Sequence, residues 1–382
     1  MGKFDEKQFN ELVFRKYMET IENPRVNRLI KAGIFVVDPK LAGVLPDGVG
    51  GNYMQENFVG RLAGTDVLYD GSTNITADTL DTYKRGLVVI GKARAFKEED
   101  FTESITGKDF MSNVAEQLVE YQDEKHQDIM LIILKALFDK TDGVLKEKRV
   151  EKSLASLSAT DIIDGLKVQG DKSGNIRAIA MHSAILAELK KANLVQNVKF
   201  IEVGGIQRDL GIYTLDGREV IEDDTVAPEE SYSASTDVSV VAGKVYYTRS
   251  GTSPNYTYTK VASPTGNPST SGYYERTLAY PVYLLGRNAF TWQPLGVKVP
   301  LEMWRQPLTN GGQTFLINRE RYFMAPFGCS FKASAMSGLA PTDVELGTAT
   351  SWELCNTGGV SPKSIELKTI PLACIVFSIS GI

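Results

Sequence analysis

The chain has 382 residues and a mass of 42.0 kDa, more than one hydrophobic core usually organises, so two or three compact units are expected. Hydrophobic residues make up 42% and charged residues 23%, which is ordinary for a globular protein. The net charge of −5 and the pI of about 5.4 argue against a dedicated DNA-binding protein, because such proteins attract phosphates with a basic surface.

Cysteine usage and hydropathy further restrict the class of protein to which the chain can belong. Cys329, Cys355 and Cys374 form no close pair in sequence, so neither a disulfide framework nor a zinc site is predicted, and a reducing compartment is indicated. The charged N-terminal sequence lacks the apolar segment of a secretory signal. No run of about 18 apolar residues predicts a membrane span.

The first 47 residues begin with an expected amphipathic helix. Phe9, Val13 and Tyr17 share one face at a spacing near 3.6 residues, and Pro24 ends the helix or closes the turn after it. This helix either caps the core of its own subunit or packs on a neighbouring one.

Residues 48–100 predict a long hairpin. Strand-like sequence at 57–69 and 84–96 flanks a polar tip in which Asp70 and Gly71 supply turn chemistry. A two-stranded hairpin with this much charge is not stable alone, so it needs a partner surface. Its basic residues include Arg61, Lys84, Arg85, Lys92 and Arg94.

A long helix and a mixed region follow. Apolar spacing over residues 109–138 predicts roughly thirty helical residues, about 45 Å, which indicates an elongated subunit. Residues 159–228 alternate between helix and strand, with Thr160 or Asp161 as the first helix cap and Asp216-Gly217 as a type I′ hairpin turn. Together these predict an α+β unit.

Residues 229–275 break the composition of the chain. They contain no Leu, Ile, Phe, Met, Cys or His, and their apolar side chains are mainly Val and Tyr. A disordered linker is one interpretation. The alternation in Tyr256-Thr-Tyr258 favours a small inserted β module with a Tyr-lined core. A second hairpin is predicted over residues 297–321, and an apolar strand over 370–379.

Several short motifs resemble catalytic or ligand-binding sites, but each lacks residues that such a site requires. Residues 165–172 lack the Gly-Lys-Ser/Thr ending of a phosphate loop, and residues 139–143 lack the alternating ligands of a calcium loop. His182 beside Ser183 reads as a helix cap with a semi-buried imidazole, and His126 as a residue on a solvated part of the long helix. The sequence therefore predicts a structural protein rather than an enzyme, with no cofactor and no metal.

The order of these parts resembles the major capsid protein of tailed bacteriophages, whose fold is shared with encapsulins. The resemblance covers nearly the whole chain except residues 229–275. It rests on Ala178-Ile-Ala-Met181-His182-Ser183 before a helix, Gly286-Arg-Asn-Ala289-Phe, Val299-Pro-Leu-Glu302, Pro326-Phe-Gly328, Pro341-Thr342 and Trp352.

This resemblance implies an α+β, phage major-capsid-type fold with an inserted small β domain. The implied parts are an N-arm at 1–47, an extended E-loop hairpin at 48–100, a peripheral domain with the spine helix at 101–158, the first part of the axial domain at 159–228, the inserted β module at 229–275, an axial strand at 276–285, a peripheral hairpin at 286–322, and the axial return at 323–382.

The implied function is self-assembly, as pentamers and hexamers, into the icosahedral head shell around double-stranded DNA. The implied partners are a separate scaffolding protein, a portal, a decoration protein at the 229–275 module, and DNA by weak non-specific contact, with no membrane. The implied location is the virion, and the host cytoplasm during assembly. The candidates for intersubunit contact are Phe9, Val13, Arg61, Asp70, Gly71, Arg85, Lys92 and Arg94.

Two alternatives remain open. One is an encapsulin-like compartment with an enzyme as cargo, which the inserted module argues against. The other is a surface-binding structural protein, which the Tyr-, Ser- and Thr-rich module suggests and the missing secretory signal argues against.

Overall fold

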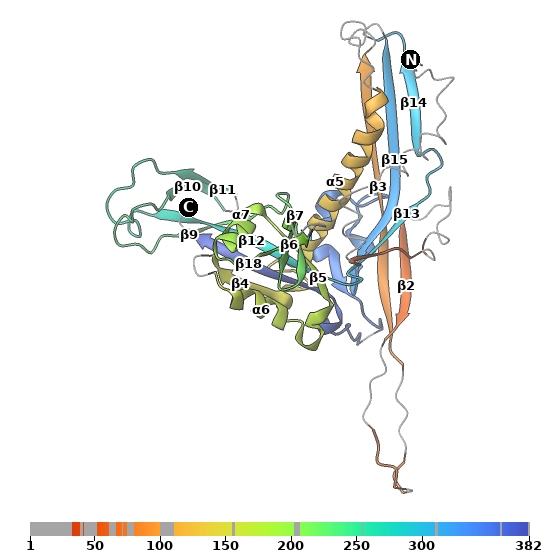
Figure 1. Ribbon diagram of the computed structural model, residues 1–382, viewed down its shortest axis with the longest axis horizontal. Helices are drawn as coiled ribbons and strands as arrows, with labels where there is room; N and C mark the ends of the chain where they lie inside the picture. Colours follow the sequence, from red (N-terminus) through yellow and green to blue (C-terminus); the bar gives the residue numbers. More distant parts are fainter. Residues whose placement is uncertain are drawn as a thin grey trace. The chain divides into compact units, whose positions relative to one another are not determined.

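The computed structural model describes residues 33–38, 41, 52–60, 66–70, 72–74, 80–99, 111–154, 157–201, 207–253, 255–309, 312–359 and 361–380. The predicted N-terminal helix with Phe9 and Val13, and also Arg61 and Gly71, lie outside the described residues. The chain divides into two compact units (Figure 1). Unit 1 comprises residues 1–146 and 287–370, and unit 2 comprises residues 147–286 and 371–382.

Unit 1 is built on a six-stranded sheet in the order β1-β13-β15-β3-β2, with β14 also paired to β15. Its strands are β1 (Phe35–Val36), β2 (Tyr53–Val59), β3 (Thr82–Glu99), β13 (Phe290–Leu295), β14 (Leu301–Gln306) and β15 (Gln313–Pro326), with a separate pair formed by β16 (Cys329–Phe331) and β17 (Trp352–Leu354).

The predicted long hairpin forms where β2 and β3 pair antiparallel, from Tyr53↔Val88 to Val59↔Thr82. The other edge of β3 pairs with β15 from Val89↔Phe323 to Gln313↔Glu99. Strand β15 therefore supplies, within the subunit, a partner for the half of β3 that follows Val88. The segment Leu87-Val-Val-Ile90 is buried because it crosses the middle of this sheet.

The predicted long helix is confirmed as α5 (Met111–Leu137), which has 27 residues. Leu118, Ile129 and Ile133 are buried at helical spacing, as expected for a helix with one face against a sheet. Beyond α5, the carboxylate of Asp139 accepts hydrogen bonds from the backbone of Thr141 and Asp142, which confirms a polar stop rather than a calcium loop. A short helix, α8 (Asp343–Leu346), lies later in unit 1.

Unit 2 is built on a ten-stranded sheet in the order β11-β10-β12-β5-β8-β7-β6. Strand β18 pairs with both β12 and β4, and β9 pairs with β12. Its elements are β4 (Arg149–Ser153), α6 (Ala159–Lys167), β5 (Ile176–Met181), α7 (Ser183–Lys191), β6 (Gln196–Ile201), β7 (Gln207–Leu215), β8 (Arg218–Glu222), β9 (Glu229–Ala234), β10 (Tyr246–Thr252), β11 (Asn255–Lys260), β12 (Tyr273–Gly286) and β18 (Leu372–Ser380).

The core of unit 2 lies between this sheet and the two helices. Ile162 of α6 and Leu186 of α7 belong to one buried cluster with Ile179, Val282 and Ile375 of three strands. Helix and strand thus share one core, which confirms the α+β fold class. No described helix combines the length and apolar character needed to cross a membrane.

In unit 2 the predicted hairpin turn is present, but the first helix cap lies at a different residue from the one expected. Asp216 and Gly217 have φ angles of 51° and 73°, as the predicted type I′ turn requires. The first cap of α6 was expected at Thr160 or Asp161, but the N-cap is Ser158. The Ser158 backbone N–H donates to the Asp161 carboxylate at 2.9 Å, so Asp161 acts three residues into the helix, as in a capping box.

The 229–275 segment is a β module and not a linker. Strands β9 and β10 pair with the first half of β12, and β11 extends this pairing from β10. The rings of Tyr232 and Tyr258 stack with centroids 3.9 Å apart and an angle of 3° between them. Tyr247 and Tyr274 meet these two rings edge-on, so the predicted Tyr-lined core is confirmed.

The return of the chain differs from the expected boundary. Residues 323–382 were assigned together to the axial domain. In the structure, residues 323–370 lie in unit 1, because β15 continues unbroken to Pro326. Only residues 371–382, with β18, join unit 2.

Candidate functional site

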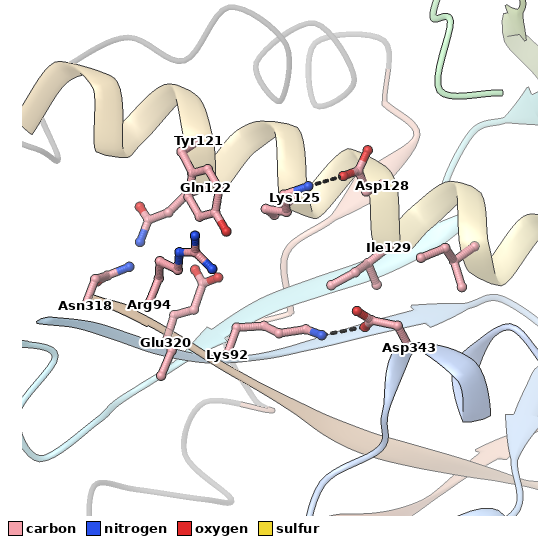
Figure 2. A pocket seen from close by; sticks show the side chains of 12 residues that line it. Lys92, Arg94, Tyr121, Gln122, Lys125, Asp128, Ile129, Asn318, Glu320 and Asp343 are labelled. Atoms are coloured by element: carbon pink, nitrogen blue, oxygen red, sulfur yellow. Dashed lines mark hydrogen bonds and ion pairs between the residues drawn. The ribbon is translucent and has the colours of Figure 1, made fainter. Parts of the chain in front are cut away.

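A pocket of about 200 Å³ lies in unit 1 between α5 and the face of β3 and β15 (Figure 2). In the β3–β15 ladder Lys92 is opposite Glu320, and Arg94 is opposite Asn318. Side chains two residues apart on a strand share a face, so all four belong to the face that α5 covers. The structure therefore brings together two of the predicted contact residues, Lys92 and Arg94. We call this site the helix–sheet pocket; its lining comprises Lys92, Ala93, Arg94, Tyr121, Gln122, Lys125, Asp128, Ile129, Ile132, Asn318, Glu320 and Asp343.

Each carboxylate of the pocket has a basic neighbour. Lys92 forms an ion pair with Asp343 at the start of α8. Lys125 donates to Asp128 at 2.7 Å, and this hydrogen bond is the main cause of the raised pKa of Lys125. Glu320 lies 3.2 Å from Nε2 of His126. The acidic groups of the pocket are therefore already engaged within the subunit.

Two donor groups of the pocket are not engaged. Arg94 is exposed, and its guanidinium has no ion pair with any described residue. Asn318 is only 7% exposed, and its amide forms no side-chain hydrogen bond within the described ranges. Figure 2 shows both side chains rising from the strands toward Tyr121 and Gln122 of α5. The amide of Asn318 and the guanidinium of Arg94 both remain accessible at the pocket, and such donors suit an acceptor that arrives from outside the subunit.

His126 was expected on a solvated part of the helix, and this is wrong. Its side chain is 12% exposed and bonds to Glu320. The imidazole packs against the ring of Tyr322 at a centroid distance of 4.7 Å and against Trp292 at 5.9 Å. Helical spacing turns His126 toward the sheet, although its sequence neighbours Glu124 and Lys125 are polar.

Arg85 lies inside unit 1 rather than on its surface. It is 6% exposed, and its guanidinium donates to the carbonyl oxygens of Ala325 at 2.8 Å and Pro326 at 3.2 Å. It also donates to the hydroxyl of Thr291 at 3.2 Å, with the carboxylate of Glu56 at 3.7 Å. Burial lowers the pKa of Arg85, and Glu56 opposes this shift.

The hairpin tip exposes two large apolar side chains. Leu68 is 74% exposed and Tyr69 is 90% exposed, so no described residue covers them. Asp70 bonds within the tip, because its carboxylate accepts from the backbone of Ser72 at 2.9 Å and of Thr73 at 2.6 Å. These hydrogen bonds lower the pKa of Asp70. The sequence predicted Val67-Leu-Tyr69 as part of the first strand of the hairpin, but β2 ends at Val59 and residues 66–69 are irregular.

The residues considered for catalysis have structural roles. Nδ1 of His182 accepts from the backbone N–H of Ala184 at 3.0 Å, which makes His182 the N-cap of α7. The backbone N–H of Ser183 donates to Asp224 at 3.1 Å. Among the described residues, no group of three or more His, Cys, Asp or Glu side chains is placed to hold a metal ion.

Comparison with known proteins identifies a similar sequence. No protein-family model matches the chain. The major capsid protein of Bacillus phage SPP1 is 23% identical over 332 residues, which cover 86% of this chain and 87% of that protein. The resemblance to tailed-phage major capsid proteins, inferred from the order of the motifs, is thereby confirmed.

Solved structures are also similar at low identity. The capsid of Helicobacter pylori bacteriophage KHP30 is 12% identical with a TM-score of 0.48, covering 99% of this chain and 100% of that one. The capsid of Ralstonia phage GP4 is 11% identical with a TM-score of 0.47, covering 78% and 84%. The SrpI encapsulin of Synechococcus elongatus is 11% identical with a TM-score of 0.39, covering 88% and 86%.

Proposed function

We propose that this chain is a major capsid protein that self-assembles into the head shell around the double-stranded DNA of a tailed bacteriophage. The observation that carries this proposal is the similarity to the SPP1 major capsid protein, which extends over 86% of the chain and includes both units. Its role is structural, because closed symmetry repeats many moderate contacts between identical subunits.

The proposed assembly uses pentamers and hexamers, a separate scaffolding protein and a portal. Unit 1 corresponds to the peripheral domain with its E-loop hairpin, and unit 2 to the axial domain with the inserted module. The net charge of −5 suits a container whose wall makes only weak, non-specific contact with packaged DNA. The subunits assemble in the host cytoplasm and end in the virion.

We further propose intersubunit contacts at the hairpin tip and at the helix–sheet pocket. The exposure of Leu68 and Tyr69 supports the first, and the free donors of Arg94 and Asn318 support the second. Arg85 no longer suits a contact role, because its guanidinium is buried and bonded within unit 1. Phe9, Val13, Arg61 and Gly71 remain contact candidates on their sequence alone.

The 229–275 module is proposed as the attachment point of a decoration protein. Its edge strand β11 pairs only with β10 among the described strands, and five of its six residues are exposed. An exposed edge strand is a template for pairing with another chain. The Tyr-rich composition of the module is also common in protein interfaces.

The test is expression with and without the scaffolding protein of the same phage, followed by electron microscopy and measurement of nucleic-acid content. We expect closed shells of uniform diameter when scaffold is present, and DNA inside shells from infected cells. A monodisperse monomer in the presence of scaffold contradicts the proposal. Closed shells that hold an enzyme and no DNA indicate an encapsulin-like compartment instead.

A further inference from the structure

We infer that the inserted module binds an extended acidic segment of a partner protein, which adds to the free edge of β11 and places carboxylates beside Arg249. The inference rests on the proposal that this module carries a decoration protein. It adds the chemistry of that contact, namely the face of the module that is used, the charge that the partner brings and the residue that anchors it.

One face of the module sheet carries tyrosine rings and basic side chains. Tyr247 is opposite both Tyr274 and Lys260, and Arg249, two residues further along β10, is opposite Tyr258. Residues that are opposite each other, or two apart on one strand, share a face of the sheet. We call this the aromatic–cationic face; its aromatic and basic residues are Tyr232, Tyr247, Tyr256, Tyr258, Tyr274, Arg249, Lys260 and Arg276.

The guanidinium of Arg249 is held in place by rings but has no counter-charge. It lies over the ring of Tyr256 at 4.4 Å from the centroid and over the ring of Tyr274 at 4.8 Å. Because two rings already restrict this side chain, it loses little conformational freedom when a partner binds. Arg249 and Lys260 are both exposed, and neither forms an ion pair or a side-chain hydrogen bond with a described residue.

The charge of this face favours an acidic partner. Among the described residues of β9 to β12, Glu230 is the one carboxylate on the aromatic–cationic face, and it lies 3.7 Å from Arg276. Arg249 and Lys260 therefore present two positive charges without a counterpart, on a chain whose net charge is −5. A partner that supplies carboxylates here gains charge-assisted hydrogen bonds.

The edge of β11 offers backbone groups to an added strand. The Val261 N–H donates to the carbonyl of Tyr246 at 2.8 Å, so these two residues form a hydrogen-bonded pair. Such pairs alternate along an antiparallel ladder, and the backbone groups of Tyr256, Tyr258 and Lys260 therefore point away from β10. An antiparallel strand that bonds to these three residues places its own opposite side chains on the aromatic–cationic face. Every second residue of the segment is therefore expected to be acidic.

A nucleic-acid strand suits this face less well than a protein segment. Single strands bind by stacking their bases on free ring faces. Here Tyr232 and Tyr258 stack on each other, and the rings of Tyr256 and Tyr274 lie against Arg249. The ring faces are thus largely occupied within the module, and the tyrosine hydroxyls are left to hydrogen-bond a protein partner.

The test measures binding of a short fluorescent peptide of Thr-Glu repeats to the full-length unassembled subunit, by anisotropy at low salt. We expect Arg249→Glu to weaken binding at least about tenfold, because a charge-assisted hydrogen bond is replaced by repulsion. A Thr-Lys peptide should bind this variant better than it binds the wild type. Methylation of the glutamate backbone nitrogens should abolish binding and methylation of the threonine nitrogens should not, because the glutamate nitrogens face β11.

Matched variants separate this site from bulk charge and from misfolding. Arg177→Glu reverses an exposed arginine of β5, outside the module, and should leave binding unchanged. Tyr256→Ala keeps every charge but removes one ring beside Arg249, and should weaken binding about two- to fivefold. Thr257→Ala, on the opposite face of β11, should have no effect. Equal protection of the Val261 amide from hydrogen exchange shows that the β10–β11 ladder is intact in each variant.

Three results would overturn the inference: no binding of the Thr-Glu peptide at millimolar concentration, unchanged binding to Arg249→Glu, or binding that survives methylation of the glutamate nitrogens. Equal competition by a single-stranded oligonucleotide of the same charge would also overturn it, because the face would then bind any polyanion. Electron microscopy of the wild-type chain judges the proposed function separately. Shells that form normally while the peptide fails to bind would remove only this inference.

Discussion

The guanidinium of Arg85 donates a 2.8 Å hydrogen bond to the carbonyl oxygen of Ala325, a residue 240 positions later in the chain. Arg85 lies on β3 and Ala325 on β15, two strands that are neighbours in the sheet of unit 1. The same guanidinium satisfies Pro326 and faces Glu56. With its hydrogen bond to Thr291 of β13, this one charged side chain links β3 to three other strands inside the subunit.

Replacing Arg85 should therefore destabilise the subunit rather than weaken assembly alone. We expect Arg85→Met to lower the free energy of unfolding by about 2–4 kcal/mol, because it leaves buried carbonyl groups and Glu56 without their partner. Urea unfolding of the unassembled chain, followed by circular dichroism, measures this. Lys97→Met on the same strand is the control and should change stability by less than about 0.5 kcal/mol. If Arg85→Met and the wild type were equally stable, Arg85 would again be a candidate for contacts between subunits.

Two glycines of β3 provide a matched pair. A Cβ at Gly86 would lie 2.5 Å from the carbonyl oxygen of Phe331 and closer still to the hydroxyl of Tyr53, whereas a Cβ at Gly91 would meet nothing within 4 Å. We expect Gly86→Ala to destabilise unit 1 by about 1–3 kcal/mol through overpacking. Gly91→Ala should be neutral or stabilising by up to about 1 kcal/mol. Thermal unfolding of the two variants, measured side by side, tests this prediction. Equal unfolding midpoints would contradict the packing of Gly86 against Tyr53 and Phe331.

Hydrogen exchange should divide the hairpin into two parts. Strand β3 pairs with both β2 and β15, so its amides should exchange slowly already in the unassembled subunit. The tip, with Leu68 and Tyr69 exposed, should exchange fast in the subunit and slowly in the assembled shell. Mass-spectrometric exchange on both forms tests this. Protection of the tip before assembly would count against an intersubunit role.

An acidic cluster should make the module sensitive to low pH. The hydroxyl of Tyr246 donates to Asp237 at 2.6 Å and Lys244 donates at 2.9 Å, and these bonds lower the pKa of Asp237. Its stabilising effect is complete above the ordinary pKa of aspartate, about 4, and is lost as the pH falls through the lower folded value. The backbone N–H of Val241 donates to Tyr246 at 3.1 Å and reports on this cluster.

We therefore expect the protection factor of the Val241 amide, corrected for intrinsic exchange, to fall as the pH drops below about 4. Asp237→Asn should remove this dependence, because the side chain no longer titrates. Lys244 stays protonated throughout, since its pKa is raised mainly by the bond to Asp237. A pH dependence that persists in Asp237→Asn would assign the effect to another group.

The module should also be removable without loss of the fold. The buried cluster of unit 2 contains no residue from 229–275. The backbone N–H of Ser235 donates to the carbonyl of Tyr273 at 2.8 Å, so these residues already stand at the end of a ladder. Replacing residues 236–272 with Asn-Gly should close a β9–β12 hairpin and leave cooperative unfolding and helix content intact. Insoluble deletion protein alongside soluble Tyr258→Ala would show that the module belongs to the core.

Local patterns in the sequence predicted much of the fold. The 3.6-residue spacing indicated α5, Asp216-Gly217 indicated a hairpin turn, and the Tyr alternation indicated a β module. Each depends on residues close together in the chain. The pairing of β3 with β15 depends on residues far apart, and no local pattern carries it.

The same limit explains why the sequence did not predict the candidate site. Lys92 and Arg94 were expected to make intersubunit contacts, and this stays a prediction. The pocket that they line also needs α5 and β15, which the sequence does not place beside them. Arg85 directly precedes Gly86 and the buried run Leu87-Val-Val-Ile90, and this was the available signal that it lies inside. His126 was misread because its polar neighbours point to other sides of the helix.

Because Arg85 and Ala325 are 240 residues apart, the strands that carry them are synthesised at different times. At about 5–20 residues per second, a ribosome makes β15 roughly 10–50 s after β3. During that interval the apolar run Leu87-Val-Val-Ile90 has left the ribosome with one edge unpaired. A nascent chain in this state invites pairing with other nascent chains. We therefore expect that reducing chaperone supply raises aggregation of the nascent chain before full-length protein appears.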